Sequence, residues 1–179
     1  MDSYPPIMTP CSGVTLIELM LAIFIMSLLL ALTLPSYSSW IQENQIRTVA
    51  ESALNGLQSA RDEAVKTNSL VTLTFNGTDW TVTPDNSTTV ITQSSGNATQ
   101  EPNATLQTSL NPITFNGLGQ VSPPSTVTIN ITDPKGGNCL SASPPGTMRC
   151  LNIVVQSGGA LRLCDPALPA TNAQSCEAS

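Results

Sequence analysis

The feature that most constrains this chain is an apolar run, Val14–Leu34, in which Glu18 is the one charged residue. As a helix, its 21 residues would be roughly 31 Å long, which is enough to cross the hydrocarbon core of a membrane. Tyr37 and Trp40 follow the run, at the level where aromatic rings favour lipid headgroups. A buried core helix is the alternative, but a run of this length and apolarity is more typical of a membrane span.

A removable secretory signal is a second alternative for the same segment. Such a signal has an apolar core of about 7–15 residues that is preceded by positive charge. Here the apolar run is longer, and residues 1–13 contain no Lys or Arg. A retained membrane anchor, at about residues 14–34, therefore fits the sequence better.

Glu18 needs a partner if this segment lies in a membrane. An unpaired carboxylate at membrane depth costs about 2.5–3.5 kcal/mol or more. No cation is near it in sequence, because the first basic residue of the chain is Arg47. A main-chain amine could serve, and a suitable one would exist if the chain were cut after Gly13.

Residues 13–19, Gly-Val-Thr-Leu-Ile-Glu-Leu, resemble the prepilin cleavage motif of type IV pilins and type II secretion pseudopilins. The resemblance implies that a prepilin peptidase cuts between Gly13 and Val14 and methylates the new N-terminus. It also implies that Glu18 neutralises the Val14 amine of a neighbouring subunit during assembly. Pro35 stands where the family has a helix-kinking proline.

The same resemblance implies a location. Residues 1–13 would be a leader peptide, and the mature chain would cross the inner membrane once, with its C-terminal domain in the periplasm. The leader departs from the family because it lacks Lys and Arg and contains Asp2, so charge does not support this orientation. Met8 offers an alternative start, and the sequence leaves the choice between Met1 and Met8 open.

Beyond the apolar run, the pattern predicts a helix that continues to Lys66 and then a β-rich region. The apolar positions recur at three- and four-residue steps: Ile46, Val49, Ala50, Ala53, Leu54, Leu57, Ala60 and Ala64. Strands are predicted at Leu70–Phe75, Thr78–Thr83, Thr88–Thr92, Ile113–Phe115, Val127–Thr132, Leu151–Gln156 and Ala160–Cys164. The turn Asn76-Gly77 between the first two is a strong hairpin signal. We therefore predict an α+β fold in which a long transmembrane and amphipathic helix (14–67) packs on a small antiparallel β-sandwich (68–179).

Within the pilin superfamily, the chain resembles the GspH/FimT group of minor pilins and pseudopilins. The similar stretches are residues 58–66, the strand 70–75 with its hairpin partner Trp80, residues 113–121 and residues 157–166. This resemblance implies a FimT/FimU-like minor pilin that helps to initiate or cap a type IV pilus. Its partners would be the prepilin peptidase, other minor and major pilins, and inner-membrane lipid. An H-like pseudopilin of a type II secretion system is the alternative.

Four cysteines would remain after cleavage, because Cys11 lies in the leader. They are Cys139, Cys150, Cys164 and Cys176. An even number in an extracytoplasmic domain predicts two disulfide bonds. Of the three possible connectivities we favour Cys139–Cys150 and Cys164–Cys176, because each closes a short loop rich in Pro and Gly. A metal site is the alternative, but no C-x₂-C pair or histidine is present.

Composition argues against catalysis and against nucleic-acid binding. The chain has no histidine and a net charge of −6, so no serine–histidine or cysteine–histidine site can form, and no cofactor is expected. Some FimT-branch members bind DNA through a C-terminal Gly-Arg-x-Arg pattern. The matching positions Gly159–Arg162 read Gly-Ala-Leu-Arg, which leaves Arg162 as the candidate DNA contact. Phosphate binding usually needs several convergent cations, so DNA binding is a second alternative. We assign no role to the five Asn-x-Ser/Thr sequons.

Overall fold

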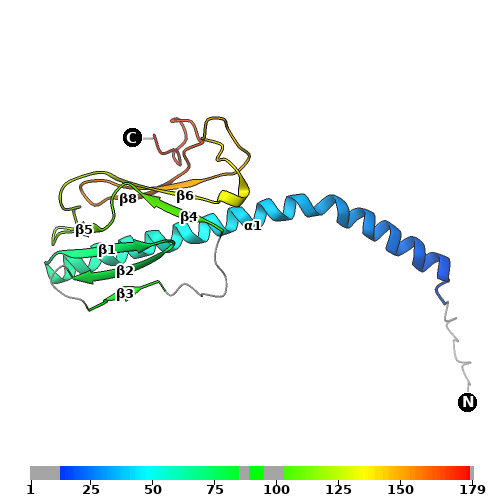
Figure 1. Ribbon diagram of the computed structural model, residues 1–179, viewed down its shortest axis with the longest axis horizontal. Helices are drawn as coiled ribbons and strands as arrows, with labels where there is room; N and C mark the ends of the chain where they lie inside the picture. Colours follow the sequence, from blue (N-terminus) through cyan, green and yellow to red (C-terminus); the bar gives the residue numbers. More distant parts are fainter. Residues whose placement is uncertain (1–12, 85–88, 95–102, 178–179) are drawn as a thin grey trace, which may run out of the picture. The chain divides into compact units, whose positions relative to one another are not determined.

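One long helix, α1 (Leu16–Thr67), is followed along the chain by strands. The computed structural model describes residues 13–84, 89–94 and 103–177, without the side chains of residues 31–39. The chain forms two compact units, Met1–Ser38 and Ser39–Ser179. The second unit contains the C-terminal part of α1 and all the strands (Figure 1).

Two antiparallel four-stranded sheets make up the β-rich part of the second unit. The β1 sheet has the order β3-β2-β1-β5, and the β6 sheet has the order β4-β6-β7-β8. The strands of the β1 sheet are β1 (Val71–Asn76), β2 (Asp79–Pro84), β3 (Thr92–Gln93) and β5 (Ile113–Phe115). Those of the β6 sheet are β4 (Thr105–Thr108), β6 (Val127–Thr132), β7 (Leu151–Val155) and β8 (Leu161–Cys164). A short 3₁₀ helix, η1 (Pro134–Gly136), follows β6.

Apolar and polar side chains alternate along the strands, so that one face of each sheet is buried. In β1, for example, Val71, Leu73 and Phe75 are buried, while Thr72 and Thr74 lie on the other face. This is the pattern of a sheet with one face on a core and one face in water. The apolar faces of both sheets meet α1 in a single hydrophobic core. The predicted α+β fold, with a helix packed on antiparallel sheets, is therefore confirmed.

The C-terminal part of α1 packs closely on the β1 sheet because small residues line its inner face. Ala50, Ala53, Ala60 and Ala64 are fully buried, as the predicted periodicity requires. Between them, Gly56 lies against the indole ring of Trp80, where an added Cβ would come within 2.6 Å of the ring. The same ring donates from Nε1 to Ser52 Oγ at 3.1 Å, and in Figure 1 β2 lies beside the cyan part of α1.

A second close contact joins α1 to two glycine turns. Gly119 and Gly159 both have positive φ, +74° and +82°, a conformation that side-chain-bearing residues rarely adopt. A Cβ on Gly159 would meet the carbonyl oxygen of Gly119, and Arg61 of α1 lies beside both glycines. Three of the stretches that carried the GspH/FimT resemblance therefore meet at one point of the fold.

The main differences between the predicted strands and the structure lie in the first hairpin, in β3 and in β4. The first hairpin loop is Gly77-Thr78, since Asn76 pairs with Asp79, so it lies one residue later than predicted. Glycine at the first loop position has φ +65°, which suits a type II′ turn. Strand β3 begins only at Thr92, while residue 88 of the predicted strand lies outside the described residues. Strand β4 was not predicted at all.

Candidate functional site

The N-terminal end of α1 is the first candidate site. Gly13 and Val14 precede the helix in non-helical backbone, and Val14 is 71% exposed. The Thr15 hydroxyl accepts a hydrogen bond from the Glu18 backbone N–H at 3.3 Å, and the Thr15 carbonyl accepts one from Leu19 N–H at 3.1 Å. Thr15 is therefore the N-cap, and the Gly13–Val14 bond lies directly before a capped helix.

Thr15 and Glu18 have the spacing of a capping box, Thr-x-x-Glu, which is a local sequence signal for the start of a helix. The position explains how a carboxylate is tolerated there. Glu18 lies in the first turn, where the helix dipole favours negative charge. Its side chain is exposed, and no ion pair to it is present among the described residues. The carboxylate is thus available to a group from outside the chain.

The helical segment after Glu18 exposes apolar side chains on every side. From Val14 to Leu30 the large apolar side chains are 49–76% exposed. A helix that is hydrophobic all round needs a lipid or protein surface to cover it. In the part of the chain that the structure describes, no helix is long and apolar enough to cross a membrane. The predicted span ends at residues 31–34, and these side chains, with that of Pro35, lie outside the described residues.

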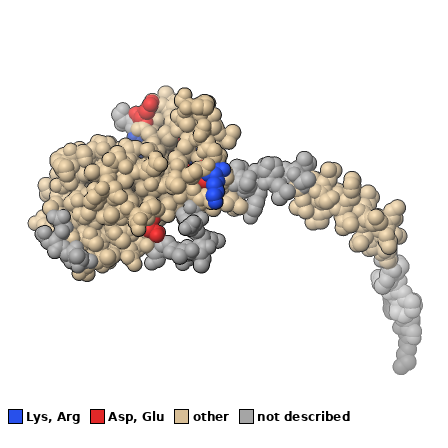
Figure 2. Space-filling model, in the orientation of Figure 1, with Lys and Arg blue, Asp and Glu red and all other residues tan. Residues whose placement is uncertain are grey.

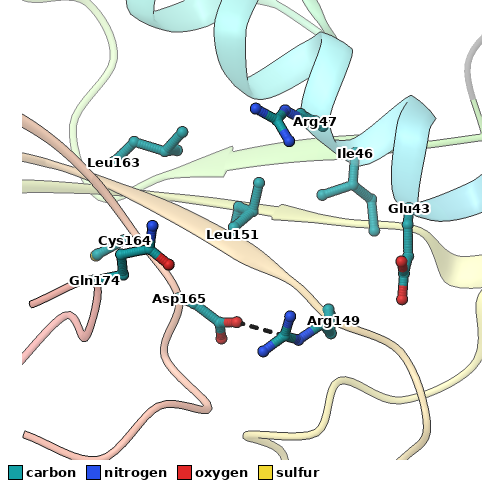
Figure 3. Close-up of a pocket in the computed structure, with 9 residues that line it drawn as sticks. All are labelled: Glu43, Ile46, Arg47, Arg149, Leu151, Leu163, Cys164, Asp165 and Gln174. Carbon is teal, nitrogen blue, oxygen red and sulfur yellow. Dashed lines mark ion pairs between the residues drawn. The ribbon is translucent and has the colours of Figure 1, made fainter. Parts of the chain in front are cut away.

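A hollow of about 300 Å³ between α1, β7 and β8 is the second candidate site. Its floor is formed by Ile46, Leu151 and Leu163 (Figure 3). Six further residues line it: Glu43, Arg47, Arg149, Cys164, Asp165 and Gln174. We refer to it below as the α1–β8 pocket. No local sequence pattern predicts this pocket, because its lining residues come from distant parts of the chain.

The two disulfide bonds flank this pocket. They join Cys139 to Cys150 and Cys164 to Cys176, the pairs favoured from the sequence. Cys150 directly precedes β7, and Cys164 is the last residue of β8. Both bonds therefore fix strand ends that form a wall of the pocket.

The C-terminal loop after β8 is also held by polar contacts. Asp165 pairs with Arg149 (Nε to Oδ2, 3.5 Å), and its backbone N–H donates to the Gln174 carbonyl at 2.8 Å. Arg162 donates from Nη2 to the carbonyls of Ala173 and Ser175. Arg162, the candidate DNA contact, thus has a structural role in tying the loop to β8. Figure 2 shows few charged side chains on the visible face, in line with the low charge content of 10%.

The sequence matches two family descriptions. "Type II transport protein GspH" matches residues 49–159, which is more than half of the chain, and "Prokaryotic N-terminal methylation motif" matches residues 8–34. The second match contains Gly13, Val14 and Glu18. No curated protein sequence matches the chain significantly.

Solved structures share the fold of the chain at low sequence identity. Two crystal forms of the type IV minor pilin FimU of Pseudomonas aeruginosa align with TM-scores of 0.51 and 0.55, both at 18% identity. These alignments cover 73% and 76% of this chain and 98% of the FimU chain. The minor pseudopilin EpsH from the type 2 secretion system of Vibrio cholerae aligns with a TM-score of 0.48 at 13% identity, over 69% of this chain and 99% of EpsH.

The family match includes the buried helix face from Val49 onward, both glycine turns and most of the strands, and the motif match includes the capped helix start. The resemblance stated from the sequence is thereby confirmed. The chain belongs to the GspH family and, with its N-terminal methylation motif, is a pilin-like subunit of the kind found as minor pilins and pseudopilins.

Proposed function

We propose that this chain is a minor pilin that helps to initiate or cap a type IV pilus, and that it has no catalytic role. The observation that carries the proposal is the start of α1. A capped helix places an exposed carboxylate, Glu18, at the fifth position after the predicted cleavage point, and exposed apolar side chains continue to Leu30. Such a surface suits a subunit that passes from a lipid bilayer into a bundle of similar helices.

Cleavage between Gly13 and Val14 would supply the partner that Glu18 lacks. The new amine of Val14 carries a positive charge, and a neighbouring subunit can present it to the exposed Glu18 carboxylate. Within a low-dielectric bundle, this attraction would exceed that of the same pair in water. We therefore propose that the pairing of Glu18 with the Val14 amine of the next subunit fixes the axial position of this subunit beneath that one in the filament.

Before assembly, the chain would be held in the inner membrane by residues 14–34, with residues 68–179 in the periplasm. The two disulfide bonds support this location, because disulfides form and persist in oxidising compartments. Pro35 would bend α1 just beyond the membrane, as prolines inside helices do.

Assignment to a pilus is supported by the shared fold with FimU, which is described as a type IV minor pilin. The short Ser/Thr-rich loops and the four C-terminal cysteines also favour the FimT/FimU branch. A type II secretion pseudopilin is the second candidate, and the description of the matching family, a type II transport protein, favours it.

A clean deletion of the gene separates these candidates. It would be scored for surface pili, twitching, DNA uptake and exoprotein secretion, with the wild-type gene restored in trans as the control. We expect loss of pili with normal secretion. Loss of secretion alone would assign the chain to a type II apparatus, and loss of DNA uptake with intact pili would revive the DNA-binding alternative.

A further inference from the structure

The α1–β8 pocket has an apolar floor that the chain itself leaves uncovered. Ile46 is only 1% exposed, but Leu151 and Leu163 are half-buried. Both leucines lie on the face of the β6 sheet that packs toward α1, and the helix does not fully cover this face at β8. The pocket volume of about 300 Å³ is at the lower end of the range for ligand pockets. A pocket of this size can hold one large side chain together with parts of the residues next to it in sequence.

The pocket is preformed. Asp165 is fixed by its ion pair with Arg149 and by accepting the Ala167 N–H at 2.8 Å. Its backbone also bonds to Gln174, and the Cys164–Cys176 bond closes the same loop. An occupant therefore does not have to order this wall, which lowers the entropic cost of binding.

The charges of the lining indicate which occupant would be favoured. Arg47 pairs with Glu51 at 2.9 Å, and Arg149 pairs with Asp165. Glu43 is exposed. Two arginines and two carboxylates line the pocket, and Glu43 is the one of these four charged residues without an ion-pair partner among the described residues. An apolar group with a cation beside it would therefore complement the pocket.

The surroundings are those of a protein interface. Trp40 lies one helical turn before Glu43 and is 60% exposed, and residues with this spacing are neighbours on a helix surface. Trp and Arg are enriched in the parts of interfaces that contribute most to binding. Trp40 is expected at the headgroup level before assembly, and once the chain leaves the membrane it is available as a protein contact near the pocket.

We infer that the α1–β8 pocket receives a neighbouring pilin-like subunit, which inserts a large apolar side chain while an adjacent lysine or arginine pairs with Glu43. The inference rests on the proposed function, because it requires assembly next to a different subunit. It adds a second contact to the one proposed at Glu18. This contact lies in the unit Ser39–Ser179, where it can select the neighbour by its side chains.

Site-specific photo-crosslinking tests the pocket directly. A benzophenone amino acid replaces Gln174, an exposed residue at the rim of the α1–β8 pocket. The full-length chain is expressed in the bacterium that naturally produces it. The control replaces Asn130, which is exposed on the outward face of β6. We expect a cross-link from position 174 to a different pilin-like protein, identified by mass spectrometry, and at least fivefold less of it from position 130.

Charge reversal then tests the role of Glu43. Glu43→Arg should lower the position-174 cross-link and the amount of chain in sheared filaments by tenfold or more. Asp62→Arg reverses the charge of an exposed residue elsewhere on α1. It should change both the cross-link and the amount of chain in sheared filaments by less than twofold. Equal effects of the two substitutions, or a cross-link to a second copy of this chain, would overturn the inference. Absence of the unmodified chain from filaments would instead overturn the proposed function.

Discussion

The contact between Gly56 and Trp80 allows two opposing effects to be compared in one substitution, Gly56→Ala. Helix propensity alone predicts that alanine stabilises the helix by about 1 kcal/mol. However, the new Cβ would lie 2.6–3.0 Å from three atoms of the indole ring, and overpacking of this kind costs about 1–3 kcal/mol. Displacing the ring would also weaken its hydrogen bond to Ser52, which contributes about 1 kcal/mol. We therefore expect a net loss of about 1–3 kcal/mol in the free energy of unfolding.

The measurement is urea unfolding of the fragment 39–179, followed by far-UV circular dichroism. The control repeats Gly56→Ala in a Trp80→Leu background, where the clash is absent. There the substitution should be neutral or stabilising by up to about 1 kcal/mol, so that the double-mutant cycle gives a coupling energy of about 1–4 kcal/mol. Stabilisation by Gly56→Ala in the otherwise unchanged fragment would refute the packing argument.

Three further predictions concern processing, assembly and the glycine turns. Intact-mass analysis of the protein purified from membranes should show a mature chain that begins at Val14 and carries an added methyl group. Recovery of the uncut chain from cells with an active prepilin peptidase would contradict this. Glu18→Ala should leave membrane insertion intact but reduce the chain in sheared filaments, whereas Asp62→Ala, at an exposed position elsewhere on α1, should not. Gly159→Ala should lower the free energy of unfolding by about 2–4 kcal/mol because of its φ of +82° and the nearby Gly119 carbonyl. Gly158→Ala, whose added Cβ would meet no atom within 4 Å, should change it by less than about 1 kcal/mol.

The buried face of α1 could be predicted from the sequence because its signal is local. Apolar residues spaced by three and four positions leave one helix face to be covered, and Ile46 and Leu57 on that face are buried. The central strands were predicted for the same reason, since β1 and β6 alternate over six residues each. Both disulfide pairs also follow from local sequence, because each bond closes a short loop.

Strand β4 could not be predicted because its signal is not local. Thr105–Thr108 contains one apolar residue, Leu106, and no alternation that would set it apart from a loop. Its conformation is set by pairing with β6, in which Leu106 lies opposite Ile131. The α1–β8 pocket was missed for a related reason. Its walls come from α1, β7, β8 and the C-terminal loop, and only the tertiary arrangement brings them together.

Arg162 shows how such an arrangement changes the interpretation of a sequence pattern. A lone arginine near the C-terminus was the candidate DNA contact, but β8 is an edge strand and edges need covering. The C-terminal loop lies next to β8, with Arg162 bonded to the Ala173 and Ser175 carbonyls. Arg162→Ala would loosen this loop and with it the wall of the α1–β8 pocket that contains Gln174. A loss of DNA uptake in that variant would therefore not by itself demonstrate DNA contact. Gln174→Lys adds a cation within the loop and keeps the backbone hydrogen bonds that Gln174 makes. Comparison of the two variants therefore distinguishes a charge effect from a structural one.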